Sequence, residues 1–351
     1  MSGHWASHLE MFMNESMTQA WPVSERARAL HHQTLVWDAH SCLPIKAGVD
    51  ISDLERHRAS GIDYVSVNVG MDFNPLAQVT RVIATYRAWI AARPDKYVLA
   101  GTVGDVRRAK SAGKLAVSFD LEGSDMIDGD LDMLRLYRDL GVRQMHLAYN
   151  RDNAVGGGCH GADIPLSNFG RKVVAEINRL GILMDCSHTG HRTSLDVMAV
   201  STKPVIFSHT CVRKLWDHPR NIWDDQIDAC AKTGGVVGVT GIGIFLGADD
   251  ASTETMMRHV DYLVQRIGAE HVGIGLDFVF RRGADEYPEG MDFALWWPPQ
   301  HRYVGRSNFV EPERMPLITE AMIKLGYPDK AIRGILGENF LRVAAETWST
   351  N

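Results

Sequence analysis

One pattern recurs along the chain: a short apolar run rich in β-branched residues, followed in most cases by a stretch with helical periodicity. Such runs indicate buried strands, and the amphipathic stretches between them, such as 77–92 and 253–267, indicate helices that cover the strands. Eight strand–helix units predict an α/β fold, a (β/α)8 barrel of the TIM type. The eight runs span residues 34–37, 64–69, 115–120, 144–148, 182–185, 205–207, 235–239 and 272–276.

A doubly wound open sheet is the structural alternative. It normally carries a glycine-rich phosphate-binding turn after its first strand, but the run Gly156-Gly157-Gly158 follows the fourth predicted strand. The barrel is therefore favoured. We expect residues 34–351 to form it as one domain, residues 1–33 to form an N-terminal helical extension, and residues 328–346 to form a closing helix.

Composition narrows the class of protein. The 351 residues are 45% hydrophobic and carry a net charge of -6 without a basic stripe, which argues against a nucleic-acid partner. Five cysteines without tight spacing do not suggest a disulfide framework. Neither a secretory leader nor a run of ~18 apolar residues is recognisable, so we expect a soluble cytoplasmic protein without a membrane span.

Polar side chains gather where the predicted strands end. The segments Leu183-Met-Asp-Cys-Ser-His188 and Val205-Ile-Phe-Ser-His209 each finish on a histidine. Barrel enzymes place their chemistry at these ends, and imidazole is a common metal ligand. Six strand ends together contribute the following candidates: His40 and Cys42, Asp120 and Glu122, Tyr149 and Asn150, His188, His209, and Asp277.

Three histidines at matching strand ends favour a metal site over three separate structural roles. Two cations bridged by a carboxylate would supply an activated water near neutral pH, and Zn²⁺ suits nitrogen and oxygen donors. Asp277 could take a proton from that water and pass it to a leaving amine. Six other histidines are expected in helices or loops facing solvent, and His160 and His191 are left open. The six are His31, His32, His57, His218, His259 and His271.

Several segments, in order along the chain, resemble the membrane (renal-type) dipeptidases. The resemblance runs from about Leu35 to Val343, which is nearly the whole chain. Its motifs lie at the expected strand ends. The matching segments are 38–44, 120–123, 168–181, 184–188, 205–209, 219–221, 273–278 and 337–343.

The resemblance implies a barrel, often dimeric, with a binuclear zinc site that hydrolyses dipeptides, often with a D-residue at the C-terminal position. It implies that His40 binds the first zinc, that Glu122 bridges, and that His188 and His209 bind the second. Asp277 matches the acid–base carboxylate.

The same resemblance implies a small dipeptide-like substrate with a free carboxylate. Arg220 matches the arginine that binds this carboxylate, and Asn221 follows it in the same motif. A guanidinium fork suits a carboxylate. We expect a homodimer or a higher even-numbered oligomer.

Three positions depart from the family pattern. Cys42 replaces the usual aspartate of the first motif, Tyr149 stands where the animal enzymes have a substrate-contacting histidine, and Val279 replaces a second acidic residue after Asp277. A thiolate can bind zinc tightly, so Cys42 either remains a ligand or leaves a single-metal site. Tyr149 can still hydrogen-bond an oxyanion.

These departures keep two rivals open. One is a single-metal amide or ester hydrolase acting on a modified amino acid, and the other is a metal-binding relative without catalysis. A long aromatic-rich segment, 280–308, is expected to form a lid or a dimer contact near Asp277, with purely structural wrapping as the alternative.

Overall fold

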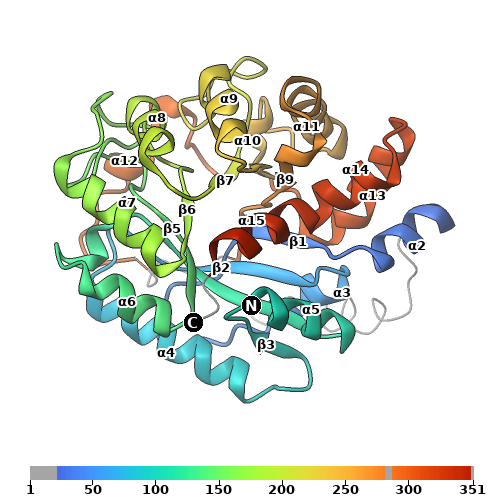
Figure 1. Cartoon of the computed structure of the whole chain (residues 1–351), viewed down its shortest axis with the longest axis horizontal. Coiled ribbons are helices and arrows are strands. Elements are labelled where there is room, and N and C mark those ends of the chain that lie inside the picture. The colour runs from blue at the N-terminus through green and yellow to red at the C-terminus, as the bar shows by residue number, and fades with distance from the viewer. Residues whose placement is uncertain (1–21, 281–286, 349–351) are drawn as a thin grey trace, which may run out of the picture.

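The computed structural model describes residues 22–280 and 287–348 (Figure 1). Its centre is a sheet of ten strands, in which every strand pairing is parallel. The order is β10-β1-β2-β4-β5-β6-β7-β8-β9, and β3 pairs with β4 beside this path. The strands are β1 Trp37–Cys42, β2 Tyr64–Met71, β3 Tyr97–Leu99, β4 Leu115–Glu122, β5 Val142–His146, β6 Leu183–Asp185, β7 Val205–Thr210, β8 Val237–Val239, β9 Val272–Ile274 and β10 Phe278–Val279.

The sheet curls back to its beginning. β9 pairs with β8, while β10, which follows β9 after three residues, pairs with β1 through Ser41↔Phe278 and Cys42↔Val279. Between them the backbone N–H of Asp277 donates to His40 O at 2.9 Å. The α/β class is therefore confirmed, and the curled parallel sheet is consistent with a TIM-type barrel.

Two strand predictions need correction. The first strand was expected over residues 34–37 but begins at Trp37, so His40 and Cys42 lie inside β1 rather than after it. β3 was not predicted, because a three-residue strand is too short to produce a periodic signal.

Helices surround the curled sheet in Figure 1. α11 has the predicted bounds, and α4 begins and ends one residue before the predicted 77–92. The helices are α2 Glu25–Gln33, α3 Leu54–Ala59, α4 Leu76–Ala91, α5 Val103–Ser111, α6 Asp132–Asp139, α7 Asn168–Leu180, α8 His191–Val200, α9 Asp224–Lys232, α10 Gly243–Leu246, α11 Thr253–Ile267, α12 Phe293–Trp296, α13 Met315–Lys324, α14 Asp329–Arg333 and α15 Asn339–Thr347.

The predicted closing helix is broken. α14 and α15 are separated by a π-helical turn at Gly334–Glu338. At Gly337 a Cβ atom would lie 2.3 Å from Leu35 O, so only glycine lets the turn pass this close to the chain before β1. Phe340 of α15, and Trp348 directly after this helix, then lie near the ring of Trp37, at centroid distances of 6.3 and 5.8 Å.

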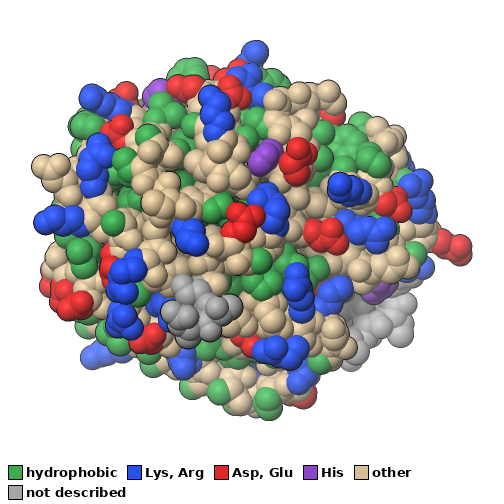
Figure 2. Space-filling view, viewed as in Figure 1, with side chains coloured by type: hydrophobic (Ala, Val, Ile, Leu, Met, Phe, Trp, Pro, Cys, Tyr) green, Lys and Arg blue, Asp and Glu red, His purple; other side chains and the backbone are tan. Residues whose placement is uncertain are grey.

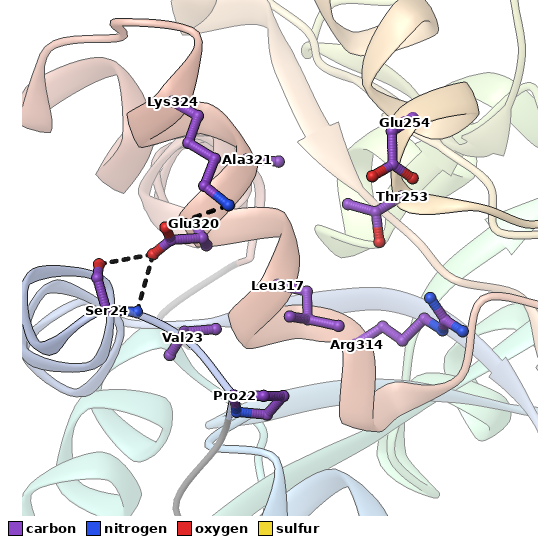
Figure 3. A pocket seen from close by; sticks show the side chains of 10 residues that line it. All are labelled: Pro22, Val23, Ser24, Thr253, Glu254, Arg314, Leu317, Glu320, Ala321 and Lys324. Carbon is purple, nitrogen blue, oxygen red and sulfur yellow. Dashed lines mark hydrogen bonds and ion pairs between the residues drawn. The ribbon is translucent and has the colours of Figure 1, made fainter.

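α2 is the described part of the expected N-terminal extension, whose residues 1–21 lie outside the described residues. Ser24 caps α2 by accepting from Ala27 N at 3.2 Å, and its hydroxyl donates to Glu320 of α13 at 2.6 Å (Figure 3). Lys324 pairs with the same carboxylate at 3.5 Å. These bonds fix α2 to α13 beside a groove that contains no candidate site residue.

Four of the histidines expected to face solvent are instead buried: His31, His57, His218 and His259. Each pairs with another part of the fold; for example, His31 Nε2 bonds Ser60 O at 3.0 Å. Burial lowers the pKa of His31 to about 4, so the ring is neutral in the folded chain. The prediction failed because such pairings join residues far apart in sequence.

On the face shown in Figure 2, lysines and arginines are interspersed with acidic residues, without a region of one sign. Among the described helices, none is long and apolar enough to cross a membrane.

Candidate metal centre

Six side chains predicted from the strand ends converge at one edge of the sheet. His40 and Cys42 project from β1, Glu122 is the last residue of β4, and His209 lies on β7. The remaining two, His188 and Asp277, follow β6 and β9. All six are buried, with at most 6% of any residue exposed.

The first set of donor atoms comes from His40, Cys42 and Asp277, which we call the His40 group. His40 Nε2 lies 3.4 Å from Cys42 Sγ and 3.6 Å from Asp277 Oδ1, and the thiol lies 3.7 Å from the same Asp277 oxygen. Glu122 Oε1 is 3.4 Å from His40 Nε2. Nitrogen, sulfur and oxygen donors therefore face a common point.

The second set comes from His188 and His209, which we call the His188 group. The two Nε2 atoms are 2.9 Å apart, and Glu122 Oε1 lies 2.9 Å from His188 Nε2 and 3.5 Å from His209 Nε2. The same carboxylate oxygen of Glu122 thus faces both groups.

Local backbone irregularities direct these side chains. The pairing of β1 with β2 shifts register between Asp38 and Ser41, around His40, and the pairing of β7 with β8 shifts between Phe207 and Thr210, around His209. Such irregularities re-aim side chains and are frequent beside active sites.

Three residues at the site have left-handed backbone conformations. The φ angles are 60° at Asn150, 65° at His188 and 55° at Asp277. This conformation costs about 1–3 kcal/mol for a residue other than glycine, and it persists only where surrounding contacts hold it.

The His40 group is oriented by a buried carboxylate. His40 Nδ1 lies 3.2 Å from Asp120 Oδ1, and Asp120 in turn accepts from Ser66 Oγ at 2.6 Å. Burial alone would lower the pKa of His40, but Asp120 and Glu122 raise it well above its usual value. Burial also raises the pKa of the Cys42 thiol. Without a bound cation, both groups therefore keep their protons near neutral pH.

The His188 group is oriented by neutral partners. His188 Nδ1 donates to Asn150 Oδ1 at 2.7 Å, and His209 Nδ1 bonds Ser208 Oγ at 2.8 Å. Burial lowers the pKa of both imidazoles well below the usual value. Because Nδ1 of His188 carries the proton, its Nε2 presents a lone pair toward Glu122 and His209.

This arrangement fits metal ions. The donor atoms of His40, Cys42 and Asp277 lie within 4.8 Å of one another, as do those of Glu122, His188 and His209. Buried lone pairs and carboxylates at this spacing repel one another unless a cation or a proton lies between them. Imidazole, thiolate and carboxylate are ligands that Zn²⁺ accepts.

Burial raises the pKa of Glu122 to about 7 and also raises the pKa of Asp277. Asn68 Nδ2 donates to the other oxygen of Glu122, so this carboxylate is held between β2 and the two donor groups. Metal binding must therefore displace protons from this cluster.

His146 is a buried residue of the site to which the sequence analysis assigned no role. Its Nε2 bonds Asp185 Oδ2 at 2.5 Å, and its Nδ1 lies 3.8 Å from Glu122 Oε1. It is the last residue of β5, which ends two residues before the predicted strand 144–148. The prediction therefore placed His146 inside a strand, and it took Tyr149 and Asn150 as the end of that strand.

Asp72, after β2, was also missed. Its carboxylate accepts from the backbone N–H groups of Ser124, Asp125 and Tyr149 at 2.7–2.8 Å. It thereby ties the loop after Glu122 to the segment that carries Tyr149. No local sequence pattern predicts this role, because its partners lie in the segments that follow two other strands, β4 and β5.

The three predicted substrate-binding residues have different surroundings. The Tyr149 ring lies 4.4 Å from the His188 ring, beside the donor cluster. Arg220 is 2% exposed and donates to His209 O at 2.9 Å, while its Nε has no hydrogen-bond partner among the described residues. Asn221 uses its amide nitrogen on the carbonyls of Trp216 and Phe245, so its role toward substrate stays a prediction.

Comparison with known proteins identifies relatives. The membrane dipeptidase family model (peptidase family M19) matches residues 24–298. An uncharacterized dipeptidase, C965.12, from Schizosaccharomyces pombe is 33% identical over 68% of this chain and 54% of its own length. Dipeptidase verJ from Clonostachys rogersoniana is 32% identical over 78% of this chain and 66% of its own. The chain thus matches between about half and two thirds of these curated relatives.

Solved structures of other proteins share this fold. An amidohydrolase from Pseudomonas aeruginosa is 29% identical, with a TM-score of 0.81 over 92% of this chain and 99% of that chain. A metallo peptidase from Rhodobacter sphaeroides, liganded with a phosphinate mimic of L-Ala-D-Ala, shares the fold at 22% identity and a TM-score of 0.73, over 90% of this chain and 100% of that chain. From its donor cluster, its fold and these matches, the chain belongs to the membrane dipeptidase family of metallopeptidases, peptidase family M19.

Proposed function

We propose that the protein is a zinc-dependent hydrolase of dipeptides or dipeptide-like amides with a free carboxylate, including those with a D-residue at the C-terminal position. The observation that carries this proposal is the single oxygen of Glu122 that faces both donor groups, at 3.4 Å from His40 and 2.9 Å from His188. A bridging carboxylate between two donor sets suits a two-metal hydrolytic site.

His40, Cys42 and Glu122 would hold one Zn²⁺, and Glu122, His188 and His209 the other. When bound, the ions supply Lewis acidity and lower the pKa of a coordinated water. Asp277 is the proposed proton carrier, since it lies 3.6 Å from His40 and 3.7 Å from His209 and has a raised pKa. It accepts the proton lost by water as the C–O bond forms, and delivers it to the nitrogen as the C–N bond breaks.

Tyr149 is suited to stabilise the developing oxyanion. Its hydroxyl accepts a hydrogen bond from Trp297 Nε1 at 3.0 Å, which leaves its own proton to donate. A fixed donor aimed at the carbonyl oxygen strengthens its bond as negative charge develops there.

Arg220 is proposed to bind the substrate carboxylate. Among the described residues, Nε of its buried guanidinium has no hydrogen-bond partner. Its Nη2 donates to the backbone carbonyl of His209. A buried guanidinium without an acidic partner favours a carboxylate ligand.

A panel of L,L and L,D dipeptides tests the function, with chelator-treated protein and zinc added back. Zinc-dependent release of amino acids is expected, and Asp277→Asn should retain metal while losing roughly 10²- to 10⁴-fold in kcat. Absence of cleavage by zinc-loaded protein across the panel would reject the proposal.

A second candidate is a single-metal hydrolase of a modified amino acid. The raised thiol pKa of Cys42 favours it, because a cysteine that keeps its proton weakens the His40 group. Metal analysis of the active protein separates the candidates: two Zn²⁺ per chain support the dipeptidase, whereas full activity with one supports the alternative.

A further inference from the structure

A cavity of about 510 Å³ opens over the metal donors, with Cys42, Glu122 and Asp277 among its lining residues. This volume suits a small-molecule site. Among the described residues that line it, the only aspartates or glutamates are Glu122 and Asp277, and none is a lysine or an arginine. Among the described lining residues, a charged substrate side chain would therefore find no counter-ion apart from Glu122 and Asp277.

Three rings from the segment after residue 286 form one side of this cavity. Tyr287, Phe293 and Trp297, which we call the aromatic wall, contact one another at centroid distances of 5.0 to 5.8 Å. Phe73 lies 5.5 Å from Trp297. Phe293 is 47% exposed although it lines the cavity, so an apolar ligand can remove its surface from water.

The aromatic wall is fixed to the metal centre on its β5 side. Trp297 Nε1 donates to Tyr149 OH at 3.0 Å, and Asn150 Nδ2 donates to Trp296 O at 2.9 Å. Residues 281–286 of the expected lid or dimer contact lie outside the described residues, and what the described part forms is a wall of the cavity.

Arg220 lies on the β7 side of the same centre. It donates to His209 O, and its guanidinium carbon lies 5.7 Å from the ring of Phe245, another lining residue. Arg220 lines a neighbouring cavity, which shares His188 with the cavity over the metal donors. If, as in the proposed function, the substrate carboxylate binds Arg220 and the scissile carbonyl lies at the donor cluster, the acyl-side residue would lie on the far side of the cluster from Arg220, in the cavity that Tyr149 and the aromatic wall line.

Resting on the proposed function, we propose that the aromatic wall binds the side chain of the residue that supplies the scissile carbonyl, and that it selects large apolar or aromatic side chains. Stacking and burial favour such groups. A lysine or glutamate side chain would lose its hydration at the aromatic wall, where no described lining residue offers it a dedicated partner.

The test is a series of X-Ala dipeptides with constant stereochemistry, in which X is Phe, Leu, Ala, Lys or Glu. We expect kcat/KM for Phe-Ala and Leu-Ala to exceed that for Ala-Ala about tenfold or more, with Lys-Ala and Glu-Ala below it. Phosphinate mimics of Phe-Ala and Ala-Ala give the same comparison in Kd, independently of turnover.

The chain offers a matched pair of variants on α12. Phe293 lines the cavity, whereas Leu295, 50% exposed on the same short helix, does not. Phe293→Ala should reduce the Phe-Ala to Ala-Ala ratio of kcat/KM, and of inhibitor affinity, by about tenfold. Leu295→Ala should leave both ratios unchanged.

Comparable rates for Phe-Ala, Ala-Ala and Lys-Ala, or equal effects of the two variants, would overturn the subsite while leaving the hydrolase intact. Failure of every dipeptide would instead reject the proposed function. In that case the two phosphinate affinities still decide the subsite, since equal values contradict it and a tighter Phe mimic supports it.

Discussion

The two donor groups that share Glu122 have opposite electrostatic designs. The His40 group combines an imidazole, a thiol and a carboxylate, and a further buried carboxylate, Asp120, lies 3.2 Å behind the imidazole. The His188 group has two imidazoles, oriented by an amide and a hydroxyl. The His40 group can attract a cation strongly, but it holds protons that a metal ion must displace. The His188 group presents neutral imidazoles.

Under the proposed two-metal function, this difference predicts that the two ions bind with unequal affinity and unequal pH dependence. Anionic donors attract a metal cation. Their metal affinity depends on pH because the metal and protons compete for the same donor atoms. The imidazoles of His188 and His209, whose pKa values are lowered, stay neutral across the physiological pH range. Four predictions test this inequality.

The largest effect is expected from Glu122→Gln, because this carboxylate faces both groups. An amide cannot supply the bridging negative charge, so both metals should bind weakly. We expect kcat/KM to fall about a thousandfold, equivalent to about 4 kcal/mol, with fewer than two Zn²⁺ per chain by elemental analysis. Two retained ions would show that Glu122 does not bridge.

Cys42→Ala should separate the groups. It removes the sulfur donor next to His40 while leaving His188 and His209 untouched, so zinc content should fall from two to one per chain. Cys42→Asp should restore the second ion, because a carboxylate replaces the thiolate. If Cys42→Ala keeps two ions, the thiol is not a ligand.

The pH dependence of metal binding should also distinguish the groups. The raised pKa values of His40 and Cys42 mean that both are protonated in the metal-free chain near neutral pH. The metal affinity of the His40 group should therefore rise with pH, about tenfold per pH unit for each proton released. His188 and His209 already lack the competing proton. In zinc titrations between pH 6 and 9, the affinity for the second zinc equivalent should rise more steeply with pH than the affinity for the first. Parallel pH profiles would contradict the predicted difference between the two groups.

The smallest effect is expected from the partner that orients His188. Asn150→Ala removes the acceptor of His188 Nδ1–H, and should weaken the metal bound there about 10- to 100-fold while sparing the His40 group. Asp120→Ala is the matched change behind His40, and competition with a chromophoric chelator measures both. Equal losses at both metals in either variant would indicate a general structural defect.

Much of this centre was predictable. His40, Cys42, Glu122, His188, His209 and Asp277 were all predicted from strand ends, because the carboxyl ends of parallel strands meet at one edge. His146 was missed because the predicted strand 144–148 runs past it, whereas β5 ends at this residue. Asp72 and Trp297 could not be found this way, because their importance lies in contacts with Tyr149 from other elements.

The buried histidines mark another limit of sequence reasoning. His31 lies in α2 with polar neighbours and was expected at the surface, but it joins Ser60 and Thr319 across the fold. Helical position alone does not reveal which face a second helix will cover.

The sequence by itself determined the α/β alternation, the types of donor atoms and the strand ends that carry them, since periodicity and spacing are local properties. Only the tertiary structure decided how those donor atoms separate into the His40 group and the His188 group. Register shifts surround His40 and His209, and the backbone is left-handed at His188 and Asp277, where these side chains meet. These conformations are unfavourable locally and exist only because distant strands and loops hold them, which is why no local pattern encodes them.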